Sequence, residues 1–401
     1  MSSLTRQFSW VSGGRVAAAL LQAAVLLLMA ERLGPSNFGV LTAAIALTVV
    51  PQTLSDLGLT TFILRTRPDR REDGRITYAI HVNAVATSIG AALYSAGVLV
   101  FALFVDWSLL ALLPLAVWLA GEKSCEVSMA VAVADRDARL NASVLLGRRA
   151  AAFVALVPLL LLGTDPIWAF TVSQAVTSLG ALLVVRRLLA PRLPKLENIG
   201  LGGLLGLTRA YWLHTVATQV RSLDTAITAF VVGPYQAGLY AVASRLTNPL
   251  RILPSSLVAV LIPQIVRDQG LIARTTRALL VAMLLAMATI YLALAYVAPT
   301  AIPWALGPEY LPSVVPVQIV CVGLIFGVTA SILAGVLQAQ GRQRLVGISS
   351  TVTSVYCVIA IAALASIHGA IGAAVGLVSA FFIQTLMMAI GYAFGGRKSI
   401  T

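Results

Sequence analysis

The chain has 401 residues, of which 59% are hydrophobic and 11% charged, and its mean hydropathy is +0.92. Soluble domains of this length are far less apolar, so the composition excludes them and indicates an integral membrane protein. The net charge of +13 is spread over several separate segments. This scatter favours anionic lipid headgroups over nucleic acid as the partner.

Twelve apolar segments follow one another along the chain, each close to the 20 or so residues that a membrane span needs. The first begins soon after the N-terminus and shows no small-residue cleavage site, so we interpret it as a span and not as a signal peptide. The predicted spans are residues 11–31, 38–64, 76–104, 108–132, 148–163, 167–186, 206–232, 236–264, 278–304, 312–338, 345–366 and 370–393.

The widest connector, residues 187–205, carries two prolines and three glycines and divides the chain near its middle. Six predicted spans lie on each side of it. We therefore predict an all-α polytopic membrane protein with two six-helix bundles, residues 1–195 and 196–401.

Connectors rich in arginine alternate with connectors that contain almost none. Lysine and arginine are retained on the cytoplasmic side of short loops, so the alternation gives an orientation. It predicts that both termini lie in the cytoplasm and that the number of spans is even. The basic segments are residues 65–75, 136–149, 186–195, 267–277, 342–344 and 397–398.

Two short motifs recur in the second half of the chain. Residues 34–40 (GPSNFGV) return as residues 233–239 (GPYQAGL), 199 positions later, and residues 134–140 return as residues 339–345, 205 positions later. Halves of six spans each enter the membrane the same way round, so we expect a pseudo-twofold axis along the membrane normal. Transport sites in such proteins lie between the halves, although channels and enzymes are duplicated too.

Three motifs carry a resemblance to the polysaccharide transporters, or Wzx-type oligosaccharide flippases: LGPSNFG at residues 33–39, SDLGL at 55–59 and QAQGR at 338–342. The resemblance implies the fold of the multidrug exporters and lipid II flippases, with two six-helix bundles around a central cavity that opens to either side in turn. It also implies a polyprenyl-pyrophosphate-linked oligosaccharide as substrate, moved to the outer leaflet of a bacterial cytoplasmic membrane for lipopolysaccharide or exopolysaccharide synthesis. A polysaccharide polymerase and other assembly proteins are the implied partners.

Ionisable groups inside the predicted spans are candidates for function, because a charge at bilayer depth needs a partner or a water-filled cavity. Counting at about 1.5 Å per residue from the external turns places Asp224 and Arg245 at equal depth in one hairpin. The same count places Arg15 and Asp56 at equal depth in the first hairpin. We expect an ion pair in each case. The full set is Arg15, Asp56, Glu122, Lys123, Glu126, Arg209, Arg221, Asp224, Arg245 and Arg251.

This pairing leaves Arg221 and Arg251 without an obvious carboxylate. A guanidinium offers forked donors that match phosphate oxygens, so we predict that these two bind the pyrophosphate. Arg245, Lys123 and Arg15 are further candidates for substrate binding. The alternative is that the arginines snorkel or pair structurally.

Glu122 and Glu126 lie one helical turn apart, and Lys123 can reach Glu126 at a spacing of three. Such carboxylates at membrane depth suit a relay for H⁺ or Na⁺, and Asp56 and Asp224 are the other carboxylates that serve either ion coupling or structural pairing. The alternative is a polar helix that lines a cavity. His214 also lies in a predicted span, but a lone histidine is more often a packing residue.

Three functional classes compete. A flippase for lipid-linked oligosaccharide comes first, and an ion-coupled exporter of drugs or other small molecules is the alternative. A membrane enzyme of the same sugar pathway needs a large external loop, and every external connector is short. We predict no catalytic residue, cofactor or metal site, because the three cysteines fall within spans and no GxxxxGK[ST] motif for ATP occurs.

Overall fold

The computed structural model describes residues 3–247, 250 and 274–394, and this part of the chain is helical without any strand. Nine of its helical stretches are long and apolar enough to cross a membrane. Three of the nine bend at a glycine with positive φ, at Gly34, Gly233 and Gly369. Each bent stretch therefore includes all or part of two predicted spans. The protein is a multi-pass, all-α membrane protein, as the sequence predicts.

The chain forms two compact units. The first unit consists of Met1–Val25 and Ala44–Gln219, and the second of Leu26–Ala43 and Val220–Thr401. The tip of the first hairpin thus belongs to the second unit. The sequence places the boundary between the bundles after residue 195, whereas the compact units change at Gln219.

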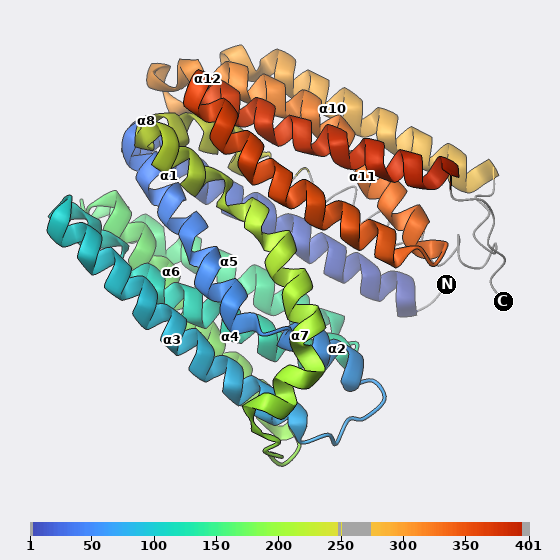
Figure 1. Ribbon diagram of the computed structural model, residues 1–401. Coiled ribbons are helices and arrows are strands. Elements are labelled where there is room, and N and C mark those ends of the chain that lie inside the picture. Colours follow the sequence, from blue (N-terminus) through green and yellow to red (C-terminus); the bar gives the residue numbers. More distant parts are fainter. Residues whose placement is uncertain (1–2, 248–249, 251–273, 395–401) are drawn as a thin grey trace. The chain divides into compact units, whose positions relative to one another are not determined.

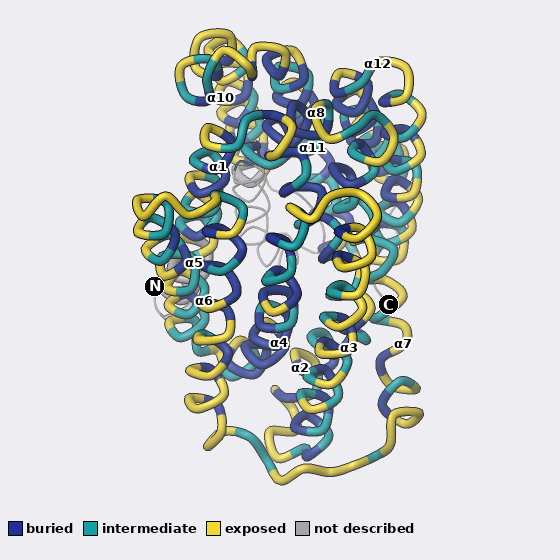
Figure 2. Tube along the Cα trace, turned by 90° about the vertical axis from the view of Figure 1, so that its left-hand side faces the viewer, coloured by how far each residue is buried: buried dark blue, intermediate teal, exposed yellow. Residues whose placement is uncertain are grey.

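The first unit contains most of α1 and the helices that follow it. In Figure 2 α4 is mostly dark blue, whereas α3 carries long yellow stretches. Burial of most of α4 places Glu122 and Lys123 inside the unit, where they must find partners. The elements are α1 (Ser3–Asp56), α2 (Leu59–Thr66), α3 (Arg75–Phe104), η1 (Trp107–Leu112), α4 (Pro114–Ala134), α5 (Ala138–Leu161), α6 (Pro166–Leu189), η2 (Ala190–Arg192) and α7 (Gly200–Gln219).

The second unit is built around α11 and α12, which lie side by side in Figure 1. The tip of α1 and α8 also belong to this unit. A four-residue 3₁₀ turn, η3, opens it and separates α7 from α8. The elements are η3 (Val220–Leu223), α8 (Asp224–Leu246), α10 (Arg274–Leu306), η4 (Pro308–Ser313), α11 (Val314–Ala339) and α12 (Gln343–Phe394).

The repeated glycine-proline motif has the same backbone conformation in both copies. Gly34 has φ 67° and ψ 170°, and Gly233 has φ 86° and ψ 166°. This region of backbone space is open almost only to glycine. Pro35 and Pro234 then begin the next helical arm, where a missing amide hydrogen is harmless.

The second repeat is also found in the structure, as a helix C-terminal cap. The amide of Asp137 donates to Ala132 O (2.9 Å) and that of Arg342 donates to Leu337 O (2.8 Å). The residue before each donor, Arg136 or Gly341, has positive φ. Both are Schellman caps, and their equivalent atoms are 205 positions apart, as the sequence repeat predicts.

One predicted connector is wrong. Residues 136–149 were expected as a basic loop, but α5 begins at Ala138 and includes most of them. The arginines are the reason for the error, because Arg148 and Arg149 lower the apolar character of a segment that is nevertheless helical. Their charge is compensated inside the first unit, by Glu122.

Candidate functional site

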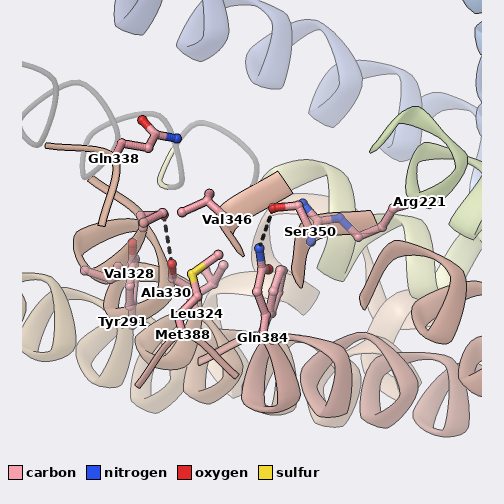
Figure 3. Close-up of a pocket in the computed structure, with 14 residues that line it drawn as sticks. Arg221, Tyr291, Leu324, Val328, Ala330, Gln338, Val346, Ser350, Gln384 and Met388 are labelled. Carbon is pink, nitrogen blue, oxygen red and sulfur yellow. Dashed lines mark hydrogen bonds between the residues drawn. The ribbon is translucent and has the colours of Figure 1, made fainter. Parts of the chain in front are cut away.

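A cavity of about 350 Å³ lies within the second unit. Its wall combines one cation, several neutral polar side chains, two aromatic rings and aliphatic groups (Figure 3). Arg221 is the one residue with a full charge among the fourteen described residues that line it. These are Arg221, Tyr291, Leu324, Gly327, Val328, Ala330, Ser331, Ala334, Gln338, Val346, Ser350, Phe381, Gln384 and Met388.

Arg221 reaches the cavity from η3, the short turn before α8. Its Cζ atom lies 5.4 Å from the centre of the Phe381 ring, a cation–π contact with α12. In Figure 3 its side chain extends toward Ser350 and Gln384. The contact holds the guanidinium beside the ring face, and guanidinium donors that point away from the ring can still bind an anion.

The neutral polar groups of the cavity come from α11 and α12. Gln384 Nε2 donates to Ser350 Oγ over 3.4 Å, and Ser331 Oγ donates to Gly327 O over 2.9 Å. Gln338 completes this set at the end of α11. Amide and hydroxyl groups of this kind both donate and accept hydrogen bonds, as sugar hydroxyls require of a binding site.

The opposite part of the lining is apolar. Leu324, Val328 and Met388 contribute aliphatic surface, and the ring of Tyr291 is fully buried, with its hydroxyl donating to Leu250 O (3.0 Å). A single cation beside hydroxyl-binding groups and apolar surface suits an anionic, hydroxylated headgroup that carries an apolar portion.

Lys123 in the first unit binds two carboxylates. Its Nζ lies 2.9 Å from Asp56 Oδ1 and 3.1 Å from Glu126 Oε2. Asp56 also accepts hydrogen bonds from Gly58 N (3.2 Å) and Thr60 Oγ1 (2.8 Å). Asp56 is thus turned toward α4 and across the break between α1 and α2.

The structure therefore corrects the expected pair of Arg15 and Asp56. Equal depth was inferred from a straight hairpin, but depth does not specify which side of a helix a residue occupies. Asp56 binds Lys123 of α4, and Arg15 is exposed on the first arm of α1.

Glu122 is bound by two arginines, Arg148 and Arg149, at the predicted border between a basic connector and the fifth span. Its Oε1 lies 2.9 Å from Arg148 Nη2 and 3.0 Å from Arg149 Nη2. The exposed fractions of the three side chains are only 17%, 9% and 13%. Packing of α5 against α4 brings the groups together.

The Asp224–Arg245 contact is present in the second unit. Arg245 Nη2 lies 3.5 Å from Asp224 Oδ1 and donates to Thr225 Oγ1 over 3.2 Å. Asp224 Oδ2 also accepts a hydrogen bond from the Tyr240 hydroxyl (3.0 Å). The tyrosine was not anticipated, although it lies on the same bent helix.

The structure thus separates the predicted binding residues. Arg221 lines the cavity, whereas Lys123 and Arg245 are engaged with carboxylates, and Arg251 lies outside the described residues. His214 is exposed on α7. Sequence reasoning missed Phe381, Ser350 and Gln384. Gln384 was the available signal, because a polar side chain within an apolar span usually has a structural or functional role. The described residues contain no cluster of histidine, cysteine, aspartate or glutamate that suits a metal.

Solved structures share this fold. Lipid II flippase MurJ in an inward closed conformation matches with a TM-score of 0.73 at 13% identity, over 94% of this chain and 86% of its own. A mutant of the Vibrio cholerae MATE transporter VcmN matches with 0.64 at 11% identity, over 98% and 97%. A MOP superfamily transporter from Pyrococcus furiosus matches with 0.60 at 12% identity, over 97% and 94%.

No curated protein shows significant sequence similarity. Residues 28–315, more than half of the chain, match the family described as Polysaccharide biosynthesis protein. The match includes the first glycine-proline motif, the ionic groups of α4 and α5, and Arg221. The chain is therefore a member of the polysaccharide biosynthesis protein family, with the fold of the MurJ and MATE transporters of the MOP superfamily.

Proposed function

We propose that the protein is a flippase that moves a polyprenyl-pyrophosphate-linked oligosaccharide from the inner to the outer leaflet of a bacterial cytoplasmic membrane. The cavity of the second unit carries the proposal, because Arg221 is the one charged residue among its described lining residues and the other polar groups there suit sugar hydroxyls. The family description adds the link to polysaccharide synthesis. The described fold argues for transport by alternating access and against a catalytic role.

In this proposal Arg221 binds a phosphate oxygen of the headgroup, and Gln384, Ser350 and Gln338 bind hydroxyls of the first sugar. The cavity volume of about 350 Å³ lies at the lower end of the usual range for ligand pockets, about 300–1,000 Å³. It accommodates part of a headgroup and not the whole lipid-linked oligosaccharide. The polyprenyl chain remains in the bilayer.

Phe381 is a positioning residue in this scheme. It does not bind the phosphate, but its ring face holds the guanidinium of Arg221 at 5.4 Å. A lysine at position 221 would keep the charge but lose both the flat stacking surface and the forked donors.

We infer both cytoplasmic termini and contact with anionic lipids from the basic connectors. The structure shows which arginines remain available. Arg67 is buried and binds Asp135 through two hydrogen bonds of 2.9 and 3.0 Å, so it stabilises the connector. Exposed side chains remain for lipid headgroups at Arg70, Arg71, Arg136, Arg139, Arg186 and Arg187.

Ion coupling is part of the proposal, with H⁺ or Na⁺ as the ion. Among the four candidate carboxylates, Asp56, Glu122 and Asp224 have side chains that are at most 17% exposed and bind cationic side chains. Glu126 is 56% exposed, although it also contacts Lys123. It is therefore the least enclosed of the four and our candidate for the coupling site.

The alternative function is ion-coupled export of a drug or another small molecule, which the structural similarity to MATE transporters favours. The cavity argues against a cationic substrate, because the fourteen lining residues that the structure describes include no carboxylate. The guanidinium of Arg221 in this cavity would repel a cationic drug.

Flipping of a fluorescent undecaprenyl-pyrophosphate-linked sugar in proteoliposomes tests the proposal. The wild-type protein should accelerate flipping, and Arg221→Ala should remove the acceleration. Arg209→Ala is the matched control, since Arg209 is exposed on α7 outside the cavity. Wild-type protein that transports a cationic dye but not the lipid-linked sugar would favour the alternative.

In cells, depletion of the protein should cause the lipid-linked intermediate to accumulate on the inner leaflet. Single cysteines test the orientation: with an impermeant thiol reagent, one at Asp165 should react in intact cells and one at Asp69 should not. The reverse pattern would contradict the proposed topology.

A further inference from the structure

The two copies of the glycine-proline motif pack against each other within the second unit, where the tip of α1 lies beside α8 (Figure 1). A methyl group added to Gly39 would overlap the carbonyl oxygen of Pro234, and one added to Gly238 would overlap that of Pro35. Gly39 and Gly238 are equivalent in the repeat, as are Pro35 and Pro234. The contact is therefore reciprocal, and we refer to these four residues as the glycine crossing.

The backbones at the glycine crossing are in direct contact. A methyl group on Gly39 would lie 2.9 Å from Gly238 N, and one on Gly238 would lie 3.1 Å from Gly39 N. Both glycines are buried. Small residues let helices approach this closely, so that backbone van der Waals contact and Cα–H···O contacts hold them together.

A second contact holds the same tip. The Tyr310 hydroxyl donates to Ala30 O over 2.9 Å, and the Phe38 ring meets the Tyr310 ring edge to face, with centroids 6.4 Å apart. Phe38 and Tyr310 are fully buried. The tip thus contacts the rest of the second unit at two places. The chain on either side of the tip belongs to the first unit.

We propose that the glycine crossing is a releasable latch between the two repeats. By sequence the tip belongs to the first repeat, and in this structure it is bound to the second. Dispersion contacts weaken within an ångström of separation, so such a crossing is either closed or open. A conformational change that separates the repeats at this end must break it. The latch controls which state is populated and does not require any particular substrate.

Thiol labelling of the full-length protein in detergent tests the latch. Ala30→Cys reports on the tip, because Ala30 is buried and lies one turn before Gly34. The parent protein, with its three buried cysteines, gives the background rate. In the reporter protein, Gly39→Ala and Gly238→Ala should each raise the labelling rate about tenfold or more, because the added methyl meets backbone and not a movable side chain.

The two substitutions break the same contact. The labelling rate of the double variant should therefore rise by much less than the product of the two single-variant increases. Tyr310→Phe should raise the rate by less, about two- to tenfold, because it removes a single hydrogen bond. Gly97→Ala is the matched control, since Gly97 on α3 faces open space, and it should leave the rate unchanged.

Folded Gly39→Ala and Gly238→Ala proteins that label at the reference rate would overturn the proposal. A rise with only one of them would also overturn it, because the contact is reciprocal. If neither variant folds, Tyr310→Phe decides, and an unchanged rate in that variant rejects the latch. Flipping activity is a separate measurement, so a loss of flipping with unchanged labelling would bear on the proposed function and not on the latch.

Discussion

The two units use ionisable side chains in different ways. In the first unit, Lys123 binds Asp56 and Glu126, and Glu122 binds Arg148 and Arg149. Three cations and three carboxylates therefore compensate one another. In the second unit, Arg245 also lies near a carboxylate, that of Asp224, but Arg221 faces a cavity and contacts the face of an aromatic ring.

This difference separates structural charge from functional charge. A buried carboxylate or guanidinium with ionic partners stabilises the packing of its helices, and removing one partner leaves the other uncompensated. A guanidinium whose nearest ring offers only a π face retains binding capacity for an anionic ligand. Substitutions in the first unit should consequently affect folding, and substitution of Arg221 should affect binding.

The largest effect is expected for Glu122→Gln. It leaves two buried guanidiniums without their carboxylate, which should cost about 3–5 kcal/mol of unfolding free energy. Thermal unfolding of the purified protein, together with the folded fraction by size-exclusion chromatography, measures the loss. Arg139→Ala, an exposed arginine on the same helix α5, is the control and should change little. Equal melting temperatures for Glu122→Gln and the wild type would show that the cluster is not structural.

Arg221→Ala should have the next largest effect, and on binding instead of stability. Loss of a charge-assisted hydrogen bond of about 1.5–3 kcal/mol weakens affinity for the lipid-linked pyrophosphate about ten- to a hundredfold. Binding is measured by titration of the purified protein, with its melting temperature as the second measurement. Arg221→Lys should recover part of the affinity.

Phe381 sharpens the same test. Phe381→Leu should lower affinity about two- to thirtyfold, because a cation–π contact contributes about 0.5–2 kcal/mol, and Phe381→Tyr should restore it. If Arg221→Ala binds the substrate as tightly as the wild type, another cationic residue must bind the pyrophosphate. The contrast between the two units would then not hold.

A smaller effect is expected for the Asp224 and Arg245 contact, which is 3.5 Å long. A double-mutant cycle with Asp224→Asn and Arg245→Met should give a coupling of about 1 kcal/mol in thermal stability. The charge swap should restore only part of the loss, because the Tyr240 hydroxyl that donates to Asp224 would then face a guanidinium. Additive effects in the cycle would mean that the residues act independently.

The smallest effect is expected for Asp137 and Arg192, whose side chains are 30% and 36% exposed. Arg192→Ala should change the unfolding free energy by about 0–1 kcal/mol, because solvent screens such pairs. Partial burial raises the pKa of Asp137, but the Leu140 amide and Arg192 outweigh it, so the pKa is lower than usual. The carboxylate therefore stabilises the fold above its ordinary pKa, and this contribution is lost as pH falls through the lowered value. The measurement compares how the unfolding free energy of the wild type and of Asp137→Asn changes as the pH is lowered. If the wild type gains stability relative to the variant, the predicted direction is wrong.

The sequence by itself determined the all-α membrane class, the approximate spans and the repeat. These features follow from local properties, namely apolar runs of span length and glycines that alone adopt the backbone angles of a turn. Gly34 and Gly233 show this directly, because the motif predicted equivalence and the dihedral angles are nearly the same. The equal depth of Asp224 and Arg245 was likewise countable along the chain.

Only the tertiary structure decided which charges are partners and which side chain faces a cavity. Depth along a helix follows from sequence position, but the direction of a side chain depends on the rotation of the helix and on its neighbours. Asp56 was therefore assigned to Arg15 and is bound by Lys123. The stacking of Arg221 on Phe381, 160 residues further along the chain, likewise depends on packing between η3 and α12. No local pattern encodes such a contact, because it exists only when distant helices pack.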